Sequence, residues 1–284
     1  MKGGMNMKLA CNYYPEVIEL IQEGLINIDY LKYPALGYQM NVFNSDDLSE
    51  YEKFTHNINK IRPIMLHGLG TTTLNLCSKN FQAQINVERT RELLNMNGVN
   101  GISVHLSGID ESLSFEVNKR ISIENLKYIK NTFPGKEFYS IENVDTLRFG
   151  ICVYPEFISQ VVRESGADFL LDISHAYCAA KALGMCFYSY MEKLPLEKVY
   201  EIHINGWIDA GDKMMCHIKI TNEAYTTLKW VLERCSPEIV TLEYGRDNDR
   251  INSGIPLMSP DKINPKAKEE IVEQLNRLNE ILGR

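Results

Sequence analysis

The sequence predicts an α/β protein with a (β/α)8 barrel fold, and three observations favour it. Eight short apolar runs recur along the 284 residues, with stretches of helical apolar spacing between them. The runs are continuously apolar, as expected of parallel strands covered on both faces. Eight such units match a (β/α)8 barrel. The alternative, a doubly wound open sheet, is less favoured because no G-x-G-x-x-G motif follows the first run.

The elements are expected in strict alternation. The predicted strands are 8–14, 27–33, 62–68, 101–107, 137–143, 168–174, 198–204 and 238–244. The predicted helices are 15–24, 46–58, 87–96, 122–131, 155–165, 179–193 and 222–235. A last surface helix is expected at about 265–282. Because the chain contains no low-complexity linker, we expect a single domain over residues 1–284.

Composition restricts the class of protein. With 44% hydrophobic and 24% charged residues, the chain is typical of a soluble globular protein. We expect no membrane span, because no apolar stretch approaches about 20 residues. The net charge of −7 disfavours nonspecific binding of nucleic acid. The seven cysteines are scattered without a C-x-x-C pair, which is typical of reduced thiols, so we expect a cytoplasmic protein.

Ionisable side chains follow the predicted strands. Five of the six histidines and three carboxylates lie at or just after a strand-like run: His67, His105, His175, His203, His217, Glu142, Asp172 and Glu243. In a barrel, the carboxyl ends of the strands meet at one mouth, so these side chains are expected to share a pocket. Buried charges need partners, and imidazoles with carboxylates suit zinc, manganese or iron. The pattern therefore predicts a metal centre at the mouth.

Each residue also has a simpler interpretation. A single histidine at a strand end is usually structural, and Glu142 or Glu243 alone can pair with a lysine or arginine of the barrel. Cys216 is either a metal ligand, a redox thiol or an ordinary loop cysteine. Lys32 is either a Schiff-base lysine or part of a salt bridge. Only His56, in a predicted helix, lies away from the strand ends.

The ordered set His, His, Glu, Asp-x-x-His, His, His, Glu resembles the xylose-isomerase-like TIM barrels, which include endonuclease IV. A closer resemblance is to the multinuclear non-heme iron-dependent oxidative enzymes, the relatives of the methanobactin-maturing oxidase. The segments that carry it include MLHGLGTTTLN, SVHL, IENVDT, PEFISQVVRESGADFLLDISHAYCAAKALGM, YMEKLPLEKVYEIHINGW, HIKITNEAYTTLKWVLERC and EIVTLEYGRDND. They extend from about residue 62 to about residue 249.

The resemblance implies a ligand set by position. His67, His105 and Glu142 would hold one metal, and Glu142 would bridge to a second metal. That second metal would be held by Asp172, His203 and Glu243, while His175 and His217 would face a third site. This implies two iron ions, or three with the third site, with zinc or manganese as the alternatives. The implied catalytic residues are Glu142, Asp172 and His175.

Three positions depart from the related families. Met215 stands where an Asp is usual two residues before the last histidine, which leaves the third metal open. Trp207 stands where the iron enzymes often carry a histidine. Lys32 stands where an acidic residue is common at the end of the second strand. The residues expected to hold two metals are unaffected by these changes.

By resemblance, the activity would be an O2-dependent oxidation of cysteine, or of another side chain, in a ribosomally made precursor peptide, with a small leader-binding partner protein. The residues themselves leave two other classes open. One is a non-redox metalloenzyme, either a sugar isomerase or epimerase, or a phosphodiesterase like endonuclease IV. Glu142 and Glu243 would then act as paired acid and base. The other is a metal-binding scaffold whose partner performs the chemistry.

Overall fold

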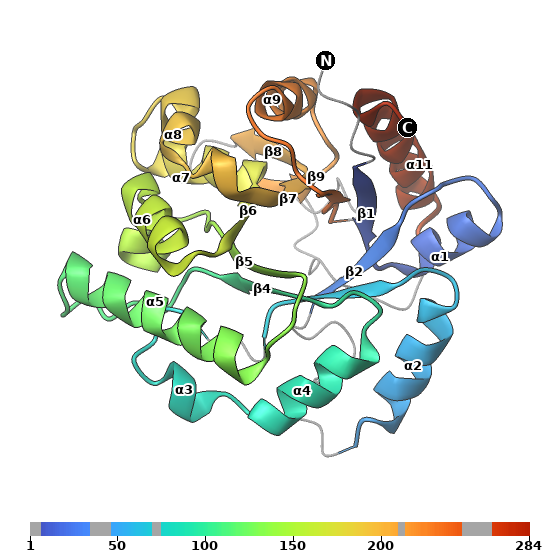
Figure 1. Ribbon diagram of the computed structural model, residues 1–284. Helices are drawn as coiled ribbons and strands as arrows, with labels where there is room; N and C mark the ends of the chain where they lie inside the picture. Colours follow the sequence, from blue (N-terminus) through green and yellow to red (C-terminus); the bar gives the residue numbers. More distant parts are fainter. Residues whose placement is uncertain (1–6, 35–46, 70–74, 210–213, 246–262) are drawn as a thin grey trace.

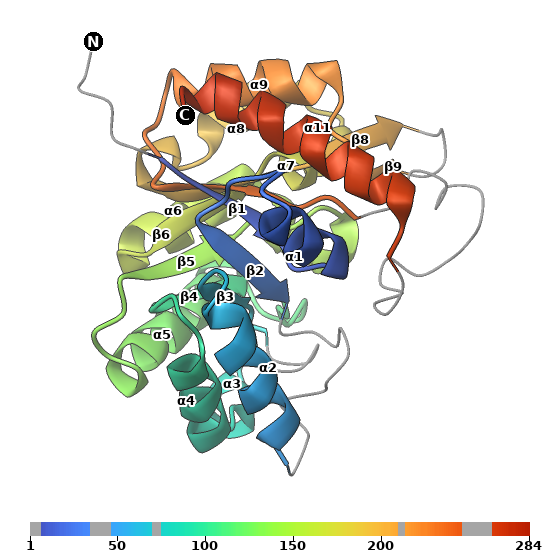
Figure 2. The ribbon, with the colours of Figure 1, turned by 90° about the vertical axis from the view of Figure 1, so that its right-hand side faces the viewer.

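The computed structural model describes residues 7–34, 47–69, 75–209, 214–245 and 263–284 (Figures 1 and 2). Within these residues, eight parallel strands form one sheet in the order β3-β2-β1-β10-β7-β6-β5-β4. The strands are β1 (Lys8–Asn12), β2 (Tyr30–Pro34), β3 (Ile64–His67), β4 (Gly101–His105), β5 (Phe138–Glu142), β6 (Asp168–Asp172), β7 (Val199–Ile204) and β10 (Ile239–Leu242). Each predicted strand overlaps one of them.

The sheet curls so that its two outer strands meet. The amide of Gly68, just after β3, donates to the carbonyl of Ser103 at 3.1 Å. The amide of Val99, just before β4, donates to the carbonyl of Ile64 at 3.0 Å. Figure 1 shows the helices as a ring around the strands. The expected (β/α)8 TIM-barrel architecture is therefore confirmed.

The helices cover the outside of the sheet. They are α1 (Pro15–Gln22), α2 (Ser49–Asn59), α3 (Phe81–Gln84), α4 (Val87–Met96), α5 (Phe115–Thr132), α6 (Pro155–Ser165), α7 (Ile173–Ala182), α8 (Phe187–Lys193), α9 (Asn222–Leu232) and α11 (Pro265–Leu282). Two short 3-10 helices are η1 (Leu147–Val153) and η2 (Leu196–Lys198). A separate antiparallel pair consists of β8 (Gly206–Asp209) and β9 (Met214–Ile218).

Two predicted helices were wrong in their limits. The helix expected at 179–193 is two helices, because the chain leaves α7 through Gly184, whose φ of 64° is the left-handed conformation that glycine adopts readily. The helix expected at 122–131 begins earlier, because the Ser114 side chain accepts a hydrogen bond from the amide of Val117 and caps α5.

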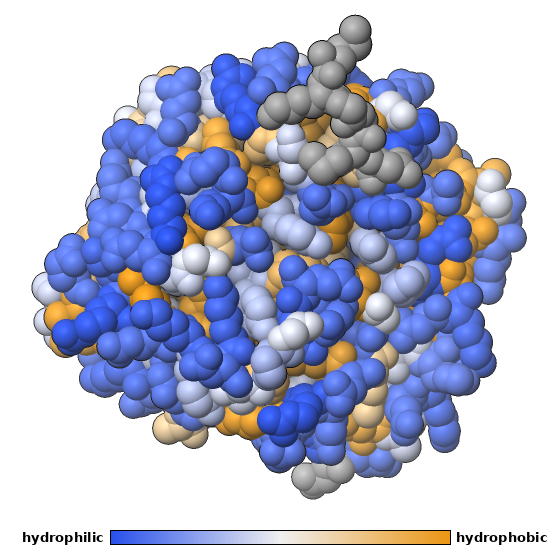
Figure 3. All heavy atoms as spheres, viewed as in Figure 1, coloured by the Kyte–Doolittle hydropathy of each residue, from blue (hydrophilic) through white to orange (hydrophobic). Residues whose placement is uncertain are grey.

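The continuous apolar runs are explained by burial on both faces of the sheet. In β6, Phe169, Leu170 and Leu171 are each 0% exposed, although successive side chains point to opposite faces. The face seen in Figure 3 is mainly hydrophilic, with apolar residues scattered over it. Among the described helices, none combines the length and apolar character needed to cross a membrane.

Candidate metal centre

The carboxyl ends of neighbouring strands place the predicted residues side by side. His67, His105, Glu142 and Asp172 are the last residues of β3, β4, β5 and β6. The parallel register aligns His105 with Glu142, and Asp172 with His203 of β7. Because all eight strands point the same way, their ends form one mouth, as the sequence predicts.

Glu142 lies at the centre of this group and is 0% exposed. Its Oε2 lies 3.1 Å from His67 Nε2 and 3.2 Å from His105 Nε2. Its Oε1 lies 3.5 Å from His203 Nδ1 and 3.5 Å from His175 Nδ1. The two oxygens therefore face different sets of imidazoles, which is the arrangement that a carboxylate bridging two ions requires.

A second set of donors surrounds His203. Its Nδ1 lies 2.9 Å from Glu243 Oε2 and 3.9 Å from Asp172 Oδ2. Ligand atoms of Glu142, Asp172, His203 and Glu243 all lie within 4.8 Å of one another, and so do those of His67, Glu142 and His203. The second compact group contains His203 where the resemblance implied His105. Both groups share Glu142 and His203.

Buried atoms without partners indicate that a cation fits this space. Among the described residues, both oxygens of Glu142, Nδ1 of His203 and Oε2 of Glu243 lie close to other ligand atoms but form no hydrogen bond of suitable geometry. Buried polar atoms are nearly always satisfied, because losing water without a replacement costs about 1–3 kcal/mol or more for each group. These atoms come from three strand ends and converge on one place. Their donor types, imidazole nitrogen and carboxylate oxygen, suit iron, zinc or manganese.

Asp172 organises the turn that follows β6. Its Oδ1 accepts hydrogen bonds from the amide of His175 at 2.8 Å and from the hydroxyl of Ser174 at 2.7 Å, which caps α7. The cap starts α7 immediately after β6, so His175 lies in its first turn and its ring returns to the mouth. His175 Nδ1 lies 3.0 Å from the carbonyl of Asn143, which fixes the orientation of the ring.

His217 reaches the mouth by a different route from the one expected. It lies on β9, a strand of the antiparallel pair, and not at the end of a barrel strand. Its amide donates to Asn205 Oδ1 at 2.8 Å, and Asn205 Nδ2 donates to Asp172 Oδ2 at 3.2 Å. His217 Nε2 lies 3.4 Å from His175 Nε2. The antiparallel pair β8–β9 therefore places His217 beside His175 at the mouth.

Lys32 is buried inside the barrel, at 0% exposure, and its role was left open by the sequence. Its Nζ lies 2.7 Å from Glu201 Oε1 and 2.6 Å from His203 Nε2. Thr241 also donates to Glu201 Oε1, at 2.6 Å. The salt-bridge interpretation of Lys32 agrees with this geometry. Because Lys32 and Glu201 occupy the Nε2 side of His203, it is Nδ1 that faces the carboxylates of the mouth, Glu142, Asp172 and Glu243.

The electrostatics of the metal-free site differ from residue to residue. Burial, reinforced by the charge of Lys32, lowers the pKa of His67 to about 4 even though Glu142 opposes the shift. His67 is therefore neutral near pH 7, as a metal ligand must be. Burial raises the pKa of Asp172 to about 6, with a further contribution from the charge of Glu243. Burial disfavours a charged Glu142, but the imidazoles of His105, His67 and His203 outweigh it and lower its pKa.

Sequence reasoning gave Cys216 no firm role, and its neighbours could not be known from the sequence. Its sulfur shares side-chain hydrogen bonds with Cys178, His175 and His217. The hydrogen bond with the Cys178 thiol and the charge of His217 lower the pKa of Cys216 to about 2, against the effect of burial. Ligand atoms of His175, Cys216 and His217 lie within 4.8 Å of one another.

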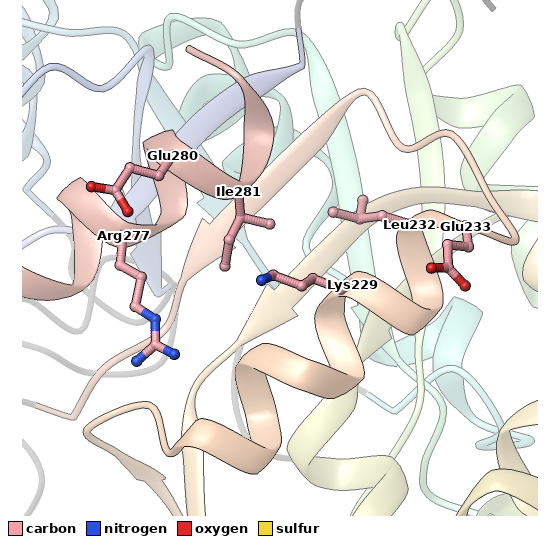
Figure 4. A pocket seen from close by; sticks show the side chains of 6 residues that line it. All are labelled: Lys229, Leu232, Glu233, Arg277, Glu280 and Ile281. Atoms are coloured by element: carbon pink, nitrogen blue, oxygen red, sulfur yellow. The ribbon is translucent and has the colours of Figure 1, made fainter. Parts of the chain in front are cut away.

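The remaining candidates lie apart from the mouth. His56 is exposed on α2, as expected of a histidine with no part in the site. A surface hollow of about 530 Å³ lies between α9 and α11 on the outer layer of helices (Figure 4). It is lined by Lys229, Leu232, Glu233, Arg277, Glu280 and Ile281. Because it contains none of the strand-end residues, it is not part of the candidate metal centre.

The fold and the converging donors together define a TIM barrel with a candidate metal centre at its mouth. The chain belongs to the family of RiPP precursor modification enzymes MbnB/TglH/ChrH, whose model matches residues 40–253. RiPPs are ribosomally made, post-translationally modified peptides. The matched range includes every strand-end residue described above, and it agrees with the resemblance found in the sequence.

Curated relatives match over short segments. A UPF0276 protein of Paraburkholderia phytofirmans is 40% identical over 57 residues, which is 20% of this chain and 19% of the relative. A UPF0276 protein of an Anaeromyxobacter species is 34% identical over 56 residues, 20% of each. The chain thus spans about a fifth of the length of these relatives.

Several solved structures share the fold at low sequence identity. D-psicose 3-epimerase superposes with a TM-score of 0.63 at 16% identity, covering 98% of this chain and 100% of that one. Endonuclease IV from Thermus thermophilus superposes with a TM-score of 0.59 at 16% sequence identity, covering 97% of this chain and 99% of that one. The IOLI protein, solved with a zinc atom, superposes with a TM-score of 0.60 at 14% sequence identity, covering 98% of each chain. These likenesses establish the fold alone.

Proposed function

We propose that this chain is a multinuclear, iron-dependent oxidase that uses O2 to modify cysteine, or another side chain, of a ribosomally made precursor peptide. Membership of the RiPP precursor modification family supports the peptide substrate. The observation that carries the metal chemistry is the set of buried, unpartnered atoms of Glu142, His203 and Glu243 converging at the barrel mouth.

In this proposal, eight residues at the barrel mouth hold the ions: His67, His105, Glu142, Asp172, His175, His203, His217 and Glu243. Iron bound there would supply one-electron chemistry with O2 and an open position for a substrate thiolate. Glu142 joins the two groups of ligands, since its oxygens face different imidazoles. Glu142, Asp172 and His175 are the proposed catalytic residues, as groups that touch the ions and the reacting atoms beside them.

The residues around the ions determine how they are held. A neutral His67 presents the lone pair of its Nε2 to the side of Glu142 Oε2, while its Nδ1 lies 3.2 Å from the Ser103 hydroxyl. Lys32 and Glu201 orient His203 from the opposite side. Asp172 holds α7, and with it His175, at the mouth. A pocket whose ligands are held largely away from solvent limits side reactions of a bound substrate.

The proposal extends to location and partners. The seven cysteines form no disulfide, which supports a reducing, cytoplasmic compartment. A precursor peptide would enter at the mouth, and a small leader-binding protein would present it. Neither a membrane nor a nucleic acid is part of this proposal.

An anaerobic metal count, followed by addition of a peptide, tests the function. Protein purified without oxygen should contain about two or three iron ions per chain. A cysteine-containing peptide should then produce a thiolate-to-iron absorption band and O2 uptake, whereas the same peptide with serine in place of cysteine should produce neither. Candidate peptides are those encoded beside the gene.

The same experiment distinguishes the other enzyme classes. Zinc or manganese in place of iron, without O2 uptake in the presence of any neighbouring peptide, would contradict the proposal. That result would favour the isomerase, epimerase or phosphodiesterase chemistry of other TIM barrels. His56→Ala serves as the matched histidine control, because this side chain is exposed on α2 away from the mouth.

A further inference from the structure

We propose that Cys216 joins His175 and His217 to form a thiolate-bearing metal site that binds Zn2+ beside the carboxylate-rich centre. This inference rests on the proposed function for His175 and His217. It assigns their site to zinc in place of a third iron ion, and it adds a sulfur ligand that the proposed function does not contain. The ligand atoms of the three residues lie within 4.8 Å of one another. This cysteine–histidine site therefore differs in donor chemistry from the groups around Glu142.

The two imidazoles face each other as ligands of one ion do. Their Nε2 atoms are 3.4 Å apart. Two nitrogens bound to one tetrahedral zinc ion at about 2.1 Å lie about 3.4 Å apart. The observed separation therefore leaves space for an ion bonded to both rings.

The far side of each ring indicates which nitrogen carries the proton. His175 Nδ1 lies 3.0 Å from the carbonyl of Asn143, and His217 Nδ1 lies 3.3 Å from the carbonyl of Glu243. A carbonyl only accepts hydrogen bonds, so each ring carries a proton on Nδ1, and Nε2 is the nitrogen that can offer a lone pair to a metal ion. An ion between the two Nε2 atoms would be bound by both rings. Backbone carbonyls behind metal-binding histidines are a common support of this kind.

Backbone geometry brings the thiol of Cys216 to the same side as the ring of His217. Neighbouring residues on a strand normally point to opposite faces. His217 has a φ of 59°, and it is the only residue other than glycine with positive φ in the part of the chain that the structure describes. A left-handed residue that is not glycine costs about 1–2 kcal/mol. The surrounding structure maintains this strained conformation, since His217 is held by Asn205 on one side and by the amide of Gly245 on the other.

The donor set is compatible with zinc. A thiolate with two imidazoles binds zinc or copper, whereas the carboxylate groups around Glu142 offer harder oxygen donors. We assign zinc because the 3.4 Å between the two Nε2 atoms matches tetrahedral zinc geometry. Three protein ligands also leave a fourth position open.

Cobalt is a direct probe, because Co2+ replaces zinc and a thiolate ligand produces a strong charge-transfer band. The full-length protein, stripped with a chelator, should develop this band when Co2+ is added under anaerobic conditions, and Zn2+ should abolish it. Cys216→Ser should lose the band, and its zinc content should fall by about one ion per chain. His217→Asn should do the same while keeping the backbone, because asparagine tolerates positive φ.

Two controls separate this site from the rest of the protein. Cys186→Ser removes an exposed cysteine and should leave the band unchanged. Glu142→Gln should reduce metal at the carboxylate centre while the band persists, so failure of the proposed function is distinguishable from failure of this site. Unchanged circular dichroism should show that each variant is folded. A wild-type protein that saturates with cobalt without the band, or a folded Cys216→Ser or His217→Asn variant that retains it, would overturn the inference.

Discussion

Replacing Asp172 with asparagine should stabilise the metal-free protein and at the same time weaken its metal binding. Asp172 is 0% exposed, and burial raises its pKa from 3.8 to about 6. Between pH 3.8 and about pH 6, this carboxyl group is mostly protonated in the folded protein and mostly ionised in the unfolded protein. The protonated carboxyl group therefore favours folding, and this advantage is lost as the pH rises through about 6.

The size of the effect follows from the shift in pKa. A shift from 3.8 to about 6 corresponds to a cost of about 3 kcal/mol above pH 7, and to well under about 1 kcal/mol near pH 4. Asparagine has no charge and avoids this cost, while its Oδ1 can still accept from the amide of His175 and cap α7. The contact between Asn205 Nδ2 and the second oxygen is lost, at about 1 kcal/mol. The net gain should be about 2 kcal/mol near pH 8.

Urea unfolding in the presence of a chelator measures this gain near pH 4 and near pH 8. Asp168→Asn is the matched control, because Asp168 begins the same strand and accepts a hydrogen bond from the amide of Tyr139 at 3.0 Å. Metal content of the Asp172→Asn variant, measured without the chelator, should fall. Equal changes in unfolding free energy at the two pH values, or a loss of stability near pH 8, would refute the reasoning.

Glu142→Gln should remove more metal than His105→Ala, because a bridging ligand serves two ions. Elemental analysis of the folded variants measures the metal content. Full metal content in Glu142→Gln would exclude the bridge. His56→Ala should leave metal content and unfolding free energy unchanged within about 0.5 kcal/mol, since the side chain is exposed. Lys32→Met should lower the unfolding free energy by about 3–5 kcal/mol, because it removes the lysine that pairs with the buried Glu201 carboxylate and leaves only Thr241 and His203 beside it. Adding Glu201→Gln should recover part of that loss, and no recovery in the double variant would contradict the pairing.

The sequence predicts the barrel and most of the mouth because both depend on local order. Continuous apolar runs identify parallel strands, and the sequence shows at which residue each run ends. His67, His105, Glu142 and Asp172 could therefore be placed together, as the last residues of neighbouring parallel strands. Their convergence needs only the chain direction that all strands of such a barrel share.

Other contacts depended on the tertiary structure, because they join residues that no local pattern relates. Lys32 pairs with Glu201 across 169 positions, and this pairing depends on how the strands of the closed barrel face one another across its interior. His217 on β9 is held in its positive-φ conformation by hydrogen bonds to Asn205 and Gly245. This conformation brings its ring to the same side as the thiol of Cys216. The apolar pattern of the sequence thus determined which residues end the strands. The packing of distant segments decided that Cys216 and Lys32 lie beside those residues.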